Sequence, residues 1–75
     1  MNKRNFVIVG YKAFAAEDII GFAYVPVHEY LDVEMSSGVH FRIHNLRKHH
    51  DSIVAQLLYS NLLEAYTAVV GDLDA

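Results

Sequence analysis

Between residues 30 and 44 the chain alternates twice between apolar and polar side chains, with a short polar turn in the middle. The first arm reads Y-L-D-V-E-M and the second reads V-H-F-R-I-H. Between them lies Ser36-Ser37-Gly38, in which Gly38 stands where a type I turn with a G1 bulge needs a left-handed residue. Alternation with a period of two is typical of strands, so the pattern predicts a β-hairpin.

The turn also sets the register of this hairpin. The predicted pairs are Leu31 with Ile43, Val33 with Phe41 and Met35 with Val39 on one face, and Tyr30 with His44, Asp32 with Arg42 and Glu34 with His40 on the other. Opposite charges across two strands are favourable, and a slip of one residue would move every side chain to the wrong face. We therefore expect Asp32 to pair with Arg42.

Two further strands are expected before the hairpin. Residues 5–11 contain a continuous β-branched run, which suggests a central strand that is buried on both faces. Residues 21–27 form a second strand, with Pro26 at an edge or a strand end because proline cannot donate to a ladder. Residues 12–20 fit either a short helical turn or a turn inside a longer hairpin, and the pattern leaves both open.

From about residue 45 the period of the apolar residues becomes helical. Asn45 or Asp51 can serve as the N-cap, and Gly71 is the natural residue just past the C-terminus. On a helical wheel of residues 52–70 the apolar arc spans roughly 240°, against ~100° for a helix packed on one core. The pattern therefore predicts one long C-terminal helix with more apolar surface than one sheet can cover.

Two arrangements would bury this excess surface. Either the sheet wraps around the helix, or the helix presents a second surface to another protomer or to a partner protein, because monomers seldom expose a large apolar patch. We favour the second arrangement, with Leu58 and Leu62 facing the sheet. The expected dimer interface consists of Tyr59, Leu63, Tyr66 and Val70.

The order of elements predicts an α+β fold, in which an antiparallel sheet of about four strands, including the 30–44 hairpin, packs against one long C-terminal helix. The 75 residues are expected to form a single domain, residues 1–75. The chain has no cysteine, which excludes disulfides and fits a cytoplasmic protein. Gln56, Asn61 and Glu64 argue against a membrane span within residues 52–70.

The charges are unevenly distributed along a chain whose net charge is −3. The acidic total disfavours a general nucleic-acid-binding protein, but cations cluster at residues 42–50, near the predicted start of the helix. Cations there oppose the helix macrodipole, so an anionic partner would explain them, but we favour a solvated loop in which Arg42 pairs with Asp32. The candidate partner-binding residues are Arg42, His44, Arg47, Lys48, His49 and His50.

No residue pattern indicates catalysis or a cofactor. His40 and His44 share a strand face but lie about 13 Å apart, and the other histidines lack the spacing of a zinc site. Cysteine is absent, the serines lack a Gly-x-Ser-x-Gly setting, and the glycines are scattered rather than gathered in a phosphate-binding loop. We therefore expect no catalytic residue, no metal site and no cofactor.

The sequence thus favours a small non-enzymatic protein-binding module that acts as a homodimer and inhibits or regulates another protein. Small acidic domains of this kind are often inhibitors, antitoxins or phage counter-defence proteins. The expected partner is another protein, and an acidic surface on that protein would suit the cations of residues 42–50. The alternative is a nucleic-acid-associated regulator that uses residues 42–50, and no membrane association is expected.

Overall fold

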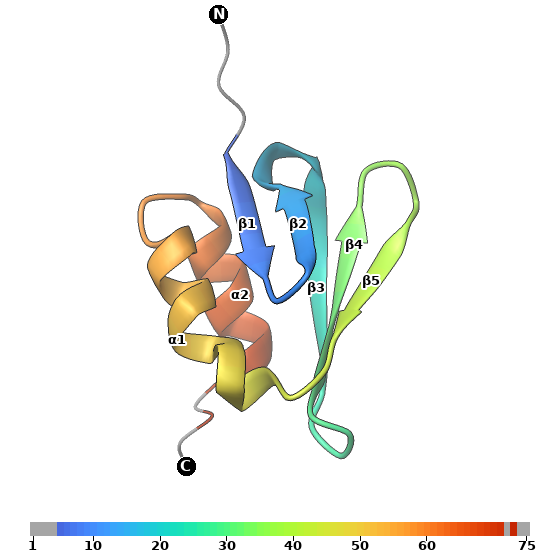
Figure 1. Ribbon diagram of the computed structural model, residues 1–75, viewed down its shortest axis with the longest axis vertical. Coiled ribbons are helices and arrows are strands. Elements are labelled where there is room, and N and C mark those ends of the chain that lie inside the picture. Colours follow the sequence, from blue (N-terminus) through green and yellow to red (C-terminus); the bar gives the residue numbers. More distant parts are fainter. Residues whose placement is uncertain (1–4, 72, 74–75) are drawn as a thin grey trace, which may run out of the picture.

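The computed structural model describes residues 5–71 and Leu73, and it has an α+β fold (Figure 1). In chain order the elements are β1 (Phe6–Val9), β2 (Lys12–Ala15), a 3₁₀ turn η1 (Ala16–Asp18), β3 (Ile19–Val25), β4 (Tyr30–Met35), β5 (His40–Ile43), α1 (Leu46–Leu57) and α2 (Leu62–Val70). The predicted fold class is confirmed, but the sheets and helices are divided differently. In the described part of the chain neither helix is long and apolar enough to cross a membrane.

The hairpin of β4 and β5 has the predicted register. All four residues of β5 oppose the residues that the alternation assigns to them. Next to the turn the Met35 N–H donates to the Val39 carbonyl at 2.9 Å, and Gly38 has a φ of 91°. This left-handed conformation is the one that the three-residue loop requires. Local alternation and turn chemistry therefore determine this part of the fold.

The strands form two antiparallel sheets, so the prediction of one sheet with about four strands is wrong. β1 pairs with β2, while β3, β4 and β5 form a second sheet in that order. β1 is not a central strand, because its side chains alternate between exposed and buried. Residues 12–20 divide into β2, η1 and the start of β3, and β2 forms a tight hairpin with β1 that is closed by Gly10 at a φ of 60°. Pro26 directly follows β3, at the strand end where it was expected.

The prediction of one long C-terminal helix is also wrong, because a turn at residues 58–61 separates α1 from α2 (Figure 1). The Ser60 hydroxyl donates to the Leu57 carbonyl at 3.0 Å and accepts from the Leu62 N–H at 3.3 Å. A serine that bonds to backbone groups on both sides competes with the helical ladder. One helical wheel therefore does not describe residues 52–70.

The break changes which apolar residues are buried. Leu58, which was expected to face the sheet, is 51% exposed, whereas Tyr66 is completely buried and Val70 is nearly so. Tyr66 and Val70 therefore belong to the core of the chain itself and are not available at its surface for a dimer. Of the expected interface, Tyr59 is 97% exposed and Leu63 is partly buried against the core.

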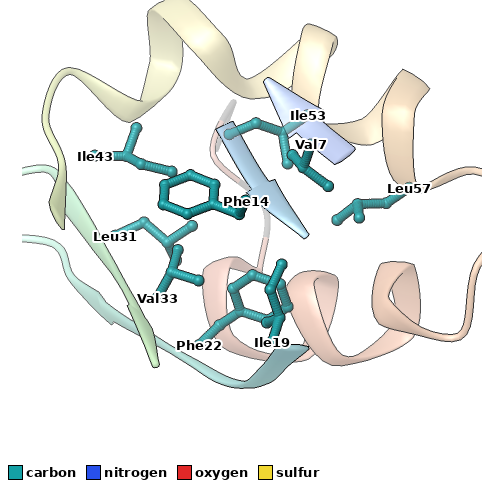
Figure 2. A pocket seen from close by; sticks show the side chains of 9 residues that line it. All are labelled: Val7, Phe14, Ile19, Phe22, Leu31, Val33, Ile43, Ile53 and Leu57. Atoms are coloured by element: carbon teal, nitrogen blue, oxygen red, sulfur yellow. The ribbon is translucent and has the colours of Figure 1, made fainter. Parts of the chain in front are cut away.

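The core is enclosed by both sheets and both helices. α1 packs on β1, and α2 packs on β3. Phe14 projects from β2 into the centre, as Figure 2 shows, and its ring meets the ring of Phe41 edge-on, with 5.0 Å between the centroids. The surrounding apolar side chains leave a void of about 10 Å³, which is no larger than a single water molecule needs. This packing fixes the β1–β2 hairpin relative to β5.

Candidate functional site

A groove lies between the tip of the β1–β2 hairpin and the junction of β5 with α1. It has a volume of about 200 Å³, and its lining consists of Val9, Tyr11, Lys12, Arg42, Ile43, His44 and His49. We call it the cationic groove. Three candidate partner-binding residues, Arg42, His44 and His49, line the groove together with Lys12, which was not among the residues predicted from the sequence.

The junction between β5 and α1 brings two of these residues to the groove. β5 ends at Ile43 and α1 begins at Leu46, so His44 lies in the connection and His49 lies in the first turns of the helix. Asn45 has a φ of 56° and precedes α1 without a side-chain cap. Asparagine tolerates this left-handed conformation, which turns the chain directly from the strand into the helix. Asn45 is therefore at the predicted N-cap position but does not cap the helix with its side chain.

Lys12 and Arg42 are each held in place by a contact within the chain. The Lys12 ammonium donates to the Arg42 carbonyl oxygen at 2.6 Å, and the Arg42 guanidinium lies over the ring of Tyr30, 4.6 Å from its centroid. Both of these contacts are to uncharged groups. Among the described residues, no carboxylate forms an ion pair with either cation or with the two histidines of the groove. The positive charge is therefore available to an anionic ligand.

Asp32, which was expected to pair with Arg42, contacts His40 instead. The His40 Nδ1 atom is 2.7 Å from the Asp32 Oδ2 atom, and the His40 Nε2 atom is 3.8 Å from the Glu34 Oε2 atom. The hydrogen bond to Asp32 raises the pKa of His40, and the charge of Glu34 acts in the same direction. The backbone register was predicted correctly, but the side-chain pairing was wrong because Asp32 reaches its diagonal neighbour. Arg42 therefore has no carboxylate partner among the described residues.

Two other candidate partner-binding residues, Arg47 and Lys48, do not line the groove. The Arg47 Nε atom donates to the Glu29 Oε1 atom at 3.0 Å, and another guanidinium nitrogen donates to the Leu73 carbonyl. Arg47 thus joins the β3–β4 turn, α1 and the C-terminal segment. Lys48 is exposed on α1. The structure separates these two cations from the groove cations.

The sixth candidate, His50, also contacts its own chain. Its Nδ1 atom is 2.7 Å from the Tyr66 hydroxyl, and the two rings stack with 5.6 Å between their centroids. On another side, the ring of Tyr66 meets the ring of Phe22 edge-on, with 5.7 Å between their centroids. Burial raises the pKa of Tyr66 to about 12, because the ionised phenolate would lose its hydration. His50 and Tyr66 therefore connect α1, α2 and β3 in the core.

Sequence reasoning missed Lys12 and Tyr11. Lys12 lies thirty positions before Arg42, and its role depends on the β1–β2 hairpin packing beside β5. Tyr11 is fully exposed at the tip of that hairpin. The only local signal is the Gly10-Tyr11-Lys12 turn at the end of an apolar run, and this signal says nothing about which strand the tip approaches.

No other feature of the described residues suggests a specific chemistry. Within residues 5–71 and 73, no group of three histidine or acidic side chains is placed to hold a metal ion. Comparison of the chain with protein-family models, with curated proteins and with solved structures finds no match. The cationic groove is therefore the candidate functional site of the described residues.

Proposed function

We propose that this protein is a non-enzymatic binding module whose cationic groove docks an acidic segment of another protein, which it thereby inhibits or regulates. Antitoxin-like and phage counter-defence proteins are examples of such regulators. The observation that carries the proposal is that Lys12, Arg42, His44 and His49 line one groove, without a carboxylate partner among the described residues. A local cluster of unpaired cations attracts anions even on a protein of net charge −3.

An acidic protein segment suits this groove better than a nucleic acid does. The groove volume of about 200 Å³ admits only a few side chains. Nucleic-acid binding draws on several phosphate contacts along an extended basic surface, and the negative net charge opposes the approach of a polyanion. A nucleic-acid-associated regulator is the second candidate, supported by the exposed Tyr11 beside the cations, because an aromatic ring can stack on a base.

We also propose that the chain forms a homodimer through the surface around Tyr59. Tyr59 and the exposed Phe6 line a second cleft of about 390 Å³, between β1 and the end of α1. Burying both rings between two copies would remove apolar surface from water. Sedimentation velocity at micromolar concentration should give a dimer mass for the wild type and a monomer mass for Tyr59→Glu. A monomeric wild type would refute the dimer.

Fluorescence anisotropy with a labelled ten-residue glutamate peptide tests the groove. One partly exposed charge pair contributes about 0.2–1 kcal/mol, so Arg42→Gln should weaken binding by up to about fivefold. Lys12→Gln should have an effect of the same size. Lys48→Gln is the matched control, because it removes one positive charge outside the groove, and it should leave the affinity nearly unchanged. Thermal unfolding checks that Arg42→Gln, which also loses its contact with Tyr30, remains folded.

Two outcomes would count against the proposal. Equal weakening by Arg42→Gln and Lys48→Gln would indicate general charge attraction rather than a groove. A ten-residue thymidine oligonucleotide provides the other arm of the experiment. Binding of this oligonucleotide but not of the peptide, with an affinity that falls steeply with salt, would favour the nucleic-acid-associated regulator.

A further inference from the structure

We infer that the acidic segment binds as an added β-strand along the free edge of β5. The inference rests on the proposed function and specifies how the partner is held. β5 is the last strand of the β3-β4-β5 sheet, and no strand among the described residues pairs with its outer side. An unpaired strand edge is a template for an extended peptide, which it can bind through main-chain hydrogen bonds.

The register shows which backbone groups of β5 face outward. The Met35 N–H donates to the Val39 carbonyl, so residues 39, 41 and 43 direct their backbone groups towards β4. His40 and Arg42 alternate with them and therefore direct their N–H and carbonyl groups away from the sheet. The contact between the Lys12 ammonium and the Arg42 carbonyl agrees with this assignment, because that carbonyl is reached from outside the sheet.

The outer edges of the two sheets differ in whether their backbone groups have hydrogen-bond partners. On β1 the Gln56 amide satisfies both outward groups of Ile8: its Oε1 atom accepts from the Ile8 N–H at 2.6 Å, and its Nε2 atom donates to the Ile8 carbonyl at 2.7 Å. On β5 only the Arg42 carbonyl has a side-chain partner. Among the described residues no group accepts a hydrogen bond from the N–H groups of His40 and Arg42. The edge of β1 is therefore closed at Ile8, whereas the edge of β5 has donors to offer.

The charges along this edge select an acidic occupant. Arg42 and His44, which directly follows the strand, both lie against the Tyr30 ring, at 4.6 Å and 5.7 Å from its centroid, so their side chains share one face at the end of β5. In an added strand the side chains on one face recur about every 6.6 Å, so acidic residues at alternate positions would lie near these two side chains. Lys12 lies beside the same edge and provides a further cation. The preferred segment is therefore extended, with an acidic residue at every second position.

N-methylated peptides test strand addition without any change of charge. The probe is an eight-residue peptide of alternating glutamate and threonine, compared with one peptide N-methylated at every glutamate and another N-methylated at every threonine. Only every second N–H of an added strand faces its neighbour. One methylated peptide should therefore bind roughly tenfold more weakly, and the other should bind almost as well as the parent. Amide hydrogen exchange at His40 and Arg42 should slow when the parent peptide binds.

The outcomes separate this inference from the proposed function. If both methylated peptides bind like the parent while Arg42→Gln still weakens binding, the strand addition is wrong and the cationic groove stands. If both are weakened equally, the alternate-facing geometry is wrong, and the strand addition is overturned. If none of the glutamate-containing peptides binds, the proposed function fails and this inference fails with it.

Discussion

Replacing Tyr66 by phenylalanine tests how α2 is held on the rest of the protein. The substitution removes one hydroxyl and keeps the ring, so the stacking on His50 and the edge contact with Phe22 remain. The lost hydrogen bond joins the Tyr66 hydroxyl to the His50 Nδ1 atom over 2.7 Å. A hydrogen bond of this kind contributes about 1 kcal/mol, so Tyr66→Phe should lower the free energy of unfolding by about 1 kcal/mol at neutral pH.

This difference in stability should disappear at alkaline pH. The pKa of Tyr66 is about 12 in the folded chain, and a tyrosine in an unfolded chain has a pKa of about 10. The folded state holds the proton more tightly, so the associated stability is fully present below pH ~10 and is lost as the pH rises towards ~12. At pH ~11 the wild type should have lost on the order of 1 kcal/mol that Tyr66→Phe, which has no phenol at this position, does not lose. The two proteins should then be almost equally stable.

Urea unfolding followed by far-UV circular dichroism, at several pH values from neutral to alkaline, measures this convergence. The other tyrosines are present in both proteins, so their titration cancels in the difference. A difference that stays constant across the whole pH range would show that the Tyr66 phenol is solvated. The buried position of Tyr66 between α1 and β3 would then be refuted.

Three further substitutions test individual contacts. Gln56→Ala removes two hydrogen bonds to the Ile8 backbone, so it should lower the free energy of unfolding by about 1–2 kcal/mol and speed hydrogen exchange at the Ile8 amide. Unchanged exchange at Ile8 would contradict the contact. Arg47→Gln should lower the free energy of unfolding by about 1 kcal/mol through its lost contacts within the chain; full stability with weaker peptide binding would instead make Arg47 a partner contact. Leu57→Ala should lower the free energy of unfolding by about 2–5 kcal/mol and Leu58→Ala by about 0.5 kcal/mol, because of the two side chains only Leu57 is buried. Equal losses of stability in urea unfolding would mean that the helix break is misplaced.

The sequence alone determined the β4–β5 hairpin and the end of the helical region. The hairpin depends on alternation over a few residues and on Gly38 in its turn, so all the information lies within a short stretch of chain. Gly71 similarly follows α2, where its N–H donates to the Thr67 carbonyl at 2.9 Å. Both features could be predicted because the interacting groups are neighbours in sequence.

The helix break shows where local reasoning was incomplete. Ser60 contains the necessary hydroxyl, but apolar residues continue on both sides of it, so helical periodicity seemed to run through the turn. The wheel then assigned Leu58 to the core and Tyr66 to an interface, the reverse of their observed burial. An apolar period indicates that a segment has a face to bury, but it does not indicate the direction in which a second helix leaves a turn.

Only the tertiary structure decided which cations form the groove. Lys12 reaches the Arg42 carbonyl from thirty positions away, because Phe14 packs against Phe41 and thereby fixes the β1–β2 hairpin relative to β5. The same folding places the exposed Arg47 side chain in contact with Glu29 and Leu73 of its own chain. Burial of apolar surface is non-directional, so a pattern of apolar residues indicates that faces must meet but not which faces will. The charges that remain open to a partner follow from that choice of faces.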